Sequence, residues 1–276
     1  MKRVLVFDSG VGGLSVLDSI AAHGGAVELD YLADNAWLPY GLKSDAELTA
    51  RIPALVQRVA AQFQSDAVVL ACNTASTIAL DQTRAALSVP VIGVVPPIKP
   101  AAAATKTGVI GLLATPATVR RVYTNDLIAN FAADKRVVRY GTSALVDAAE
   151  AKLRGETPDF AATLEALTGL FGAPGGGEID VVALACTHFP LMKEELSAAA
   201  PRPCLWLDSG EAIARRLANV LILPTGQAQK RRAALTDTSN LRAYERAFRT
   251  RGFSAFSRIA PAPSFAAEPI TDIAIA

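Results

Sequence analysis

The sequence predicts an α/β fold in which parallel strands are covered by helices on both faces. Short apolar runs of strand length alternate with helical patterns along most of the 276 residues. Hydrophobic residues make up 51% of the chain but aromatic residues only 6%, which indicates an interior of Ala, Val, Leu and Ile, as in sheets that are buried on both faces. A strand pattern that ends in cysteine also occurs twice, at residues 67–74 and 181–188.

Each predicted strand is an apolar run bounded by turn residues. The expected strands cover residues 4–8, 28–33, 67–71, 91–95, 107–113, 136–140, 180–185 and 204–207. A first helix is expected to open at about Leu14. Ser44 and Glu47 form a capping box, which predicts a helix from there through Ala61, and Thr115 followed by Pro116 marks another helix start.

Two breaks interrupt this alternation. Pro96 and Pro97, followed by Pro100, indicate a linker between a first and a second α/β unit. The stretch 172–177, rich in glycine, indicates a surface turn ahead of the second cysteine strand. A chain of this length is natural for two domains of ordinary size, each able to bury a core.

Composition excludes several classes of protein. With a net charge of +1, the chain has no strong electrostatic attraction to nucleic acid or to an anionic membrane. No segment approaches about 18 uninterrupted apolar residues, so no membrane span is expected. The start runs directly into a strand and lacks the features of a signal peptide, which predicts a cytoplasmic protein.

The cysteines are predicted to be reduced thiols. Cys72, Cys186 and Cys204 are too few and too far apart for a disulfide framework, and none has CxxC or Cys/His zinc spacing. Cys204 lies in an apolar run and is interpreted as a packing residue. No lysine context indicates a pyridoxal Schiff base, so neither a metal nor a cofactor is expected.

The repeated pattern is the strongest functional signal. Each copy ends in a thiol followed by a polar pair, which places Cys72 and Cys186 at the carboxyl ends of strands. Ligands of parallel α/β sheets bind outside those ends, so two equivalent cysteines would face one small molecule from opposite sides. That geometry suits moving a proton across a carbon. A packing role remains equally open from these residues alone, because strand ends are also where a core stops.

The segment from Asp8 to Gly13 connects the first strand to a helix. Glycines let backbone N–H groups approach an anion there, but the spacing is neither G-x-G-x-x-G nor a Walker loop. Asp8 would repel phosphate and attract an ammonium group, which favours an amino-acid site. The alternative is a tight turn in which Asp8 caps the helix.

Tyr40 and the two histidines have different sequence settings. Tyr40 beside Gly41 offers a hydroxyl or an N–H to a carboxylate, although this loop could turn without a ligand. His23 lies at an expected helix end, where a histidine usually satisfies terminal carbonyls. Only His188 has a strand-end setting.

Six stretches in order carry a resemblance to a known family. They are residues 8–14, 34–35 with 39–41, 71–75, 111–115 with Thr118, 186–188 with 190–191, and 208–210. On these stretches the chain resembles the aspartate/glutamate racemase family, and within it the glutamate racemases. The resemblance implies two similar parallel-sheet α/β domains with a pseudo-twofold relation and an active site in the cleft between them. The implied domains are residues 1–95 plus 207–276, carrying Asp8 and Cys72, and residues 96–206, carrying Cys186 and His188.

The resemblance also implies residue roles. Cys72 and Cys186 would be the two acid/base residues, Asp8 and His188 would assist the thiols, and Glu150 would partner the histidine. Residues 141–146 depart from the common family pattern. The implied substrate-binding residues are Asp8, Ser9, Tyr40, Gly41, Asn73, Thr74, Thr115, Thr118 and Thr187.

The activity implied is a cofactor-independent interconversion of L- and D-glutamate that supplies D-glutamate for peptidoglycan, by a protein that is commonly a homodimer. Two alternatives remain: a racemase for aspartate or another small amino acid, and a non-catalytic amino-acid binding protein. The retention of both cysteines argues against the binding protein, which needs neither.

The resemblance does not reach the residues beyond about Thr225. Lys230, Arg231 and Arg232, with later arginines at 242, 246, 249 and 251, make this part basic. The simplest prediction for it is a solvated helix with a frayed end.

Overall fold

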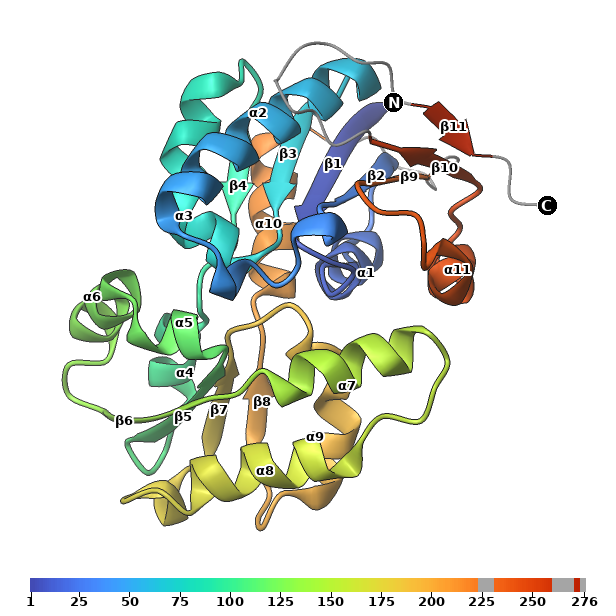
Figure 1. Ribbon diagram of the computed structural model, residues 1–276. Coiled ribbons are helices and arrows are strands. Elements are labelled where there is room, and N and C mark those ends of the chain that lie inside the picture. Colours follow the sequence, from blue (N-terminus) through green and yellow to red (C-terminus); the bar gives the residue numbers. More distant parts are fainter. Residues whose placement is uncertain (223–230, 260–270, 274–276) are drawn as a thin grey trace. The chain divides into compact units, whose positions relative to one another are not determined.

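Two separate sheets organise the residues that the computed structural model describes, which are 1–222, 231–259 and 271–273 (Figure 1). The chain divides into two units. The first unit comprises Met1–Val94, Leu153–Gly155 and Gly210–Ala276, and the second comprises Val95–Lys152 and Glu156–Ser209. Each unit therefore has its own sheet and its own covering helices.

The first sheet has the strand order β11-β10-β9-β2-β1-β3-β4. Its strand pairs are parallel except for β10 with β11, which are antiparallel. The strands are β1 (Lys2–Asp8), β2 (Val27–Ala33), β3 (Ala67–Leu70), β4 (Val91–Gly93), β9 (Arg232–Leu235), β10 (Ala255–Arg258) and β11 (Thr271–Ile273).

Helices cover both faces of this sheet. α2 and α3 pack side by side on one face, and α1 and α10 pack together on the other (Figure 1). The helical elements are α1 (Leu14–His23), α2 (Asp45–Phe63), α3 (Asn73–Ala86), α10 (Gly210–Val220), α11 (Leu241–Arg249) and the 3₁₀ helices η1 (Asn35–Trp37) and η2 (Tyr40–Leu42).

The second sheet has the order β6-β5-β7-β8, with all pairs parallel. Its strands are β5 (Val109–Ala114), β6 (Arg136–Gly141), β7 (Val181–Leu184) and β8 (Leu205–Leu207). Its helical elements are α4 (Ile98–Ala104), α5 (Pro116–Arg120), α6 (Val122–Phe131), α7 (Ala144–Leu153), α8 (Phe160–Phe171), α9 (Lys193–Ala199), η3 (Gly176–Glu178) and η4 (Phe189–Met192).

Successive residues of the central strands of this unit enter different cores. In β7, Val182 and Leu184 pack with one cluster, while Val181 and Ala183 pack with another. Side chains of a strand alternate between the two faces of its sheet. A strand with helices on both faces must therefore be apolar throughout, which is why β5 and β7 are unbroken apolar runs in the sequence.

The predicted α/β class is confirmed, and each of the predicted strands is present within about three residues. Ser44 caps α2 in the predicted capping box, with the Glu47 N–H donating to Ser44 Oγ at 3.3 Å. Thr115 is the N-cap of α5, with Pro116 following it. Pro100, which was predicted to lie in a linker, instead lies in the first turn of α4, where the absent N–H of proline costs no helical hydrogen bond.

The basic segment near the carboxyl end differs from its prediction. Arg232 belongs to β9, inside the first sheet, and its guanidinium donates to Asp30 at 2.9 and 2.5 Å. α11 is amphipathic and buries Leu241 and Phe248. The charge of this segment did not predict its burial, because Asp30, which is distant in sequence, pairs with Arg232. The apolar stripe of α11 is packed in the same way against the rest of the unit. Lys230 and residues 260–270, which are rich in Ala and Pro, lie outside the described residues.

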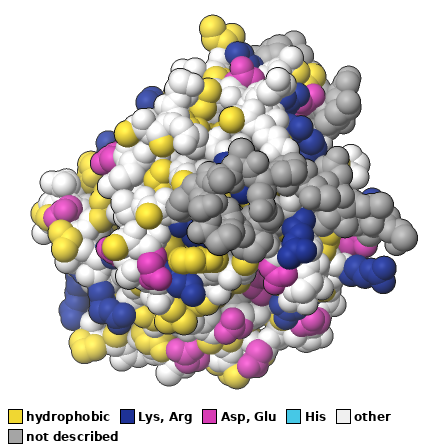
Figure 2. Space-filling view, turned by 45° about the horizontal axis from the view of Figure 1, so that its top comes forward, with side chains coloured by type: hydrophobic (Ala, Val, Ile, Leu, Met, Phe, Trp, Pro, Cys, Tyr) yellow, Lys and Arg dark blue, Asp and Glu magenta, His cyan; other side chains and the backbone are white. Residues whose placement is uncertain are grey.

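Charged side chains of both signs share the surface. Lys and Arg side chains are interspersed with Asp and Glu over the face drawn in Figure 2. Among the helices that the structure describes, none combines the length and the apolar character that crossing a bilayer requires.

Candidate active site

Both repeated cysteines lie just beyond the carboxyl end of a central strand. Ala71 continues β3 by donating its N–H to the carbonyl of Phe7, and Ala185 continues β7 in the same way, donating to Leu113. Cys72 and Cys186 follow these alanines. The two thiols therefore occupy the same topological position in their sheets, because β3 neighbours β1 as β7 neighbours β5.

The Cys72 thiol is buried at the start of a long helix. Cys72 is the N-cap of α3, and its sulfur accepts a hydrogen bond from the Ala75 N–H at 3.5 Å. Ser9 Oγ lies 3.5 Å from the same sulfur. The partial positive charge of a helix N-terminus and its free N–H groups stabilise a thiolate, so this setting suits a cysteine that ionises.

Asp8 ends β1 and is fully buried. Its Oδ2 accepts a hydrogen bond from the Gly13 N–H at 2.7 Å, so Asp8 does hold the turn into α1. A Cβ on Gly13 would approach both Asp8 Cβ and the Tyr31 hydroxyl to 2.8 Å. Only glycine allows this close approach, which keeps the segment containing Ser9 near Cys72.

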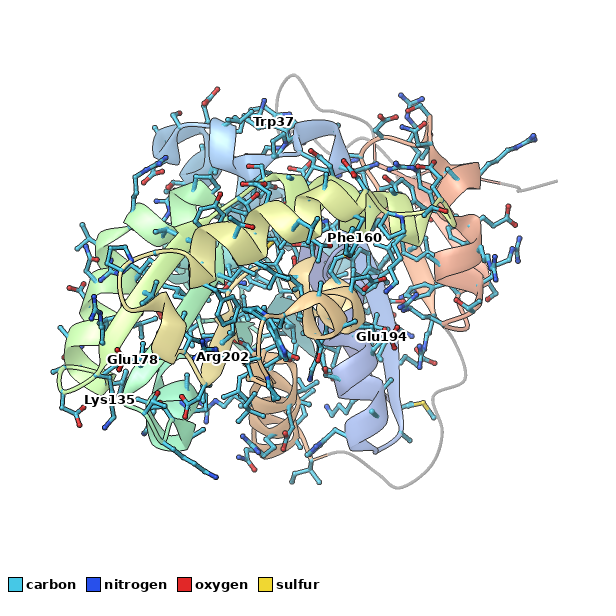
Figure 3. All side chains as sticks on the ribbon, turned by 90° about the horizontal axis from the view of Figure 1, so that it is seen from below. Trp37, Lys135, Phe160, Glu178, Glu194 and Arg202 are labelled. Carbon is cyan, nitrogen blue, oxygen red and sulfur yellow. The ribbon has the colours of Figure 1, made fainter. Side chains whose placement is uncertain are left out.

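Tyr40 lies in the core cluster that contains Cys72, and its hydroxyl donates to Asp34 Oδ2 at 2.6 Å. Arg51 donates to both oxygens of Asp34, at 2.6 and 2.7 Å, and lies 4.4 Å from the centroid of the Trp37 ring. Trp37 is labelled in Figure 3. Burial, followed by the negative charge of Asp34, raises the pKa of Tyr40 well above its ordinary value. The hydroxyl therefore keeps its proton at neutral pH.

The Cys186 thiol has a different environment. His188 Nδ1 lies 3.9 Å from Cys186 Sγ, and His188 Nε2 lies 2.6 Å from Glu150 Oε1. All three side chains are buried. Burial by itself would lower the pKa of His188, but the hydrogen bonds and negative charges of Cys186 and Glu150 outweigh it and hold this pKa well above the ordinary value. A protonated imidazole beside the sulfur favours the thiolate.

The remaining predicted site residues lie at strand ends or helix starts. Asn73 and Thr74 begin α3, and both are buried. Within the described residues, Asn73 Oδ1 is buried without a hydrogen-bond partner. Thr115 and Thr118 lie at the start of α5, with their hydroxyl oxygens 3.0 Å apart. Gly41 is in η2, and Thr187 is buried between Cys186 and His188.

The structure thus gathers two groups of predicted residues, one in each unit. Asp8, Ser9, Tyr40 and Cys72 belong to the first, and Glu150, Cys186 and His188 belong to the second. Arg51 was missed by sequence reasoning, since a solitary arginine in a helix carries no signal of a buried partner. Among the described residues, no three His, Cys, Asp or Glu side chains gather as a metal site would require.

Comparison with known proteins identifies the class. A family model described as Asp/Glu/Hydantoin racemase matches residues 13–217. The chain belongs to this family, which confirms the resemblance seen in the motifs.

Individual relatives narrow the comparison. The glutamate racemase of Sphingopyxis alaskensis is 54% identical over 225 residues, covering 82% of this chain and 83% of the relative. That of Vibrio vulnificus is 48% identical over 228 residues, covering 83% and 84%. The crystal structure of Escherichia coli glutamate racemase in complex with L-glutamate and the activator UDP-MurNAc-Ala matches with a TM-score of 0.85 and 40% identity, covering 94% of this chain and 98% of that one.

Proposed function

We propose that this protein is a cofactor-independent glutamate racemase in which Cys72 and Cys186 are the two acid/base residues. The observation that carries the proposal is the pair of buried thiols at equivalent strand ends of two similar sheets. Glutamate as substrate follows the relatives, which are glutamate racemases at up to 54% identity over most of the chain.

Inversion of a stereocentre by proton transfer explains why two thiols are needed. One group must remove the α-proton from one face, and another must deliver a proton to the opposite face. A single base that returned its own proton would regenerate the starting enantiomer. One cysteine therefore begins as a thiolate and the other as a thiol, and the two exchange states when the substrate enantiomer is reversed.

Each thiol has local support for its ionised state. A free thiol has a pKa near 8.5, so forming the thiolate at pH 7 costs about 2 kcal/mol. In the first unit the Ala75 N–H and the start of α3 offset this cost at Cys72. In the second unit His188 lies beside Cys186, and Glu150 holds its ring.

The carbanionic state needs more stabilisation than a base alone provides. A positioned base contributes on the order of 10²–10⁴ in rate, and preorganised donors around the carboxylate of the substrate must supply the rest. We assign the binding of the substrate, with backbone N–H and hydroxyl donors on its carboxylate and acceptors on its ammonium group, to the residues that the family resemblance implies. They are Asp8, Ser9, Tyr40, Gly41, Asn73, Thr74, Thr115, Thr118 and Thr187.

Asn73 has the most specific support within this set. Its buried Oδ1 has no hydrogen-bond partner among the described residues, and buried polar atoms are normally satisfied. An ammonium group of the substrate would satisfy it. Asp8 would add a negative charge for the same ammonium group while it holds the turn through Gly13.

The biological setting follows from the product. D-glutamate is a component of peptidoglycan, so this enzyme would supply a precursor for cell-wall synthesis and contribute to cell shape. We assign the reaction to the cytoplasm and the active form to a homodimer, in keeping with the family. Sedimentation of the purified full chain tests the dimer, and a mass of one subunit would contradict it.

The test of the function is circular dichroism of L-glutamate, and separately of L-aspartate, incubated with purified protein in a reducing buffer. Loss of the glutamate signal alone is the expected result. Loss of the aspartate signal alone would overturn the substrate assignment, and no change with either would favour an amino-acid binding protein.

A further inference from the structure

The Asp34 carboxylate is the centre of a buried network in the first unit. Asp34 is fully buried and accepts hydrogen bonds from Arg51, Tyr40 and Thr236. The bond from the Thr236 hydroxyl, 2.9 Å long, comes from the segment after β9. The Asp34 N–H donates to the carbonyl of Asp8 at 2.9 Å, so the network stands directly beside the end of β1.

A second aspartate–arginine pair belongs to the same strand region and provides a comparison. Asp30, within β2, accepts two bonds from Arg232, whose guanidinium lies 4.1 Å from the centroid of the Phe63 ring. Both pairs are therefore bidentate and both stack on an aromatic ring. The difference is that Asp34 also binds Tyr40, whereas Asp30 is paired with Arg232 and Arg3.

The hydrogen bond to Asp34 fixes the orientation of the Tyr40 hydroxyl proton. A phenol has one proton, and the bond to Asp34 uses it. The oxygen can then only accept further hydrogen bonds. Tyr40 and Cys72 pack in the same buried cluster, so this acceptor belongs to the surroundings of the proposed base.

We propose that Asp34, held by Arg51, is a positioning residue for the Cys72 half of the reaction. It fixes the Tyr40 hydroxyl as an acceptor, which stabilises Cys72 in its protonated state, after the thiolate has taken the α-proton. The inference rests on the proposed function, because it assumes that Cys72 transfers a proton to and from one face of the substrate.

The test uses Asp34→Asn. The introduced amide has one acceptor oxygen in place of two and no negative charge, so it cannot accept both bonds from Arg51, and its hold on the Tyr40 proton is weakened. We expect kcat/KM for glutamate to fall about tenfold, as for the loss of a hydrogen bond to a charged group. Tyr40→Phe is expected to cause a similar loss, and Asp34→Asn added to Tyr40→Phe is expected to cause little more, since both act through one hydroxyl.

The decisive readout is the isotope effect of an α-deuteron, measured with deuterated L-glutamate and with deuterated D-glutamate. Slowing only the Cys72 step makes that step more rate-limiting. The isotope effect must then rise for the enantiomer whose α-hydrogen Cys72 removes and fall for the other. A variant that merely folds less well leaves both isotope effects at their wild-type values.

Asp30→Asn is the matched control, since it removes the carboxylate of a bidentate pair in the same sheet without touching Tyr40. We expect unchanged isotope effects with both enantiomers. Should Asp34→Asn fail to fold, Arg51→Lys retains the charge while it loses the two-pronged contact, and the same divergence is expected. Isotope effects that stay at the wild-type values in Asp34→Asn or Arg51→Lys would overturn the proposal. So would losses in the double variant that equal the product of the losses in the two single variants. Lack of racemisation by the wild type would instead overturn the proposed function.

Discussion

The two cysteines follow corresponding strands, yet the groups around them differ in kind. Cys72 is supported by a backbone N–H, a helix start and a serine hydroxyl. Cys186 precedes a short 3₁₀ helix and is supported by the histidine of a His188–Glu150 pair. Backbone dipoles do not titrate, whereas an imidazolium does. Corresponding positions of the two sheets thus have different supporting groups. Of the two sets, only the surroundings of Cys186 are expected to respond to pH near neutrality.

The largest expected effect comes from removing either thiol. Cys72→Ser and Cys186→Ser should each lower net racemisation of glutamate by at least about a thousandfold, because a serine hydroxyl is a far weaker acid and base than a thiol. Circular dichroism of both enantiomers measures this loss, with Cys204→Ser as a control expected to retain activity. Full activity in either active-site variant would end the two-thiol account.

The next largest effect is expected from removing the Glu150 carboxylate, which acts on Cys186 through His188. Glu150→Gln removes the carboxylate that holds His188 protonated and oriented, so kcat is expected to fall about 10- to 100-fold, the value of one or two hydrogen bonds to a charged group. Glu195→Gln is the control, because Glu195 pairs with Lys152 in the same unit. Similar kinetics in the two variants would remove Glu150 from the mechanism.

The pH dependence of stability tests the histidine directly. The folded-state pKa of His188 lies above its ordinary value, so the folded chain binds this proton more tightly than the unfolded chain. The resulting stability is complete below about pH 6.5 and is lost as the pH rises through the folded-state pKa, by at most about 1.4 kcal/mol per pH unit. Urea unfolding of wild type and His188→Gln from pH 6 to 9 should show their difference shrinking. A constant or growing difference would contradict the assignment.

The smallest effect concerns the Cys72 half. Ser9→Ala removes the hydroxyl 3.5 Å from Cys72 Sγ, and a neutral hydrogen bond contributes about 0.5–1.5 kcal/mol. We expect kcat to fall by a factor of about 2 to 12, with no change in the pH profile. Ser19→Ala, which removes a hydroxyl bonded to a helix carbonyl on α1, should leave the kinetics at the wild-type values. If Ser9→Ala lowered kcat more than Glu150→Gln does, the side-chain support would matter more at Cys72 than at Cys186, contrary to this account.

The features predictable from sequence are the ones that local pattern controls. The repeated strand and thiol, the capping box at Ser44 and the Thr115 helix start depend on neighbouring residues, and all are present. The motifs at 8–14 and 186–188 indicate the chemistry through the resemblance to the family.

The features that the sequence did not predict depend on pairs of residues that are far apart in the chain. Arg51 is 17 positions from Asp34, and Thr236 is 202 positions from it, so no local pattern reveals the network around Tyr40. The same reason applies to β9, whose Arg232 reads as a solvated charge until Asp30 is seen beside it. The contact of Glu150 with His188 spans 38 positions, and only the family resemblance pointed to it.

The most direct test of the two-thiol account is NMR detection of α-deuterium entering L- and D-glutamate in D₂O with Cys72→Ser and with Cys186→Ser. Each variant keeps one thiol and therefore one face. The account predicts that each exchanges the α-hydrogen of one enantiomer without inversion, and that the two variants act on opposite enantiomers. Exchange of the same enantiomer by both variants would contradict it.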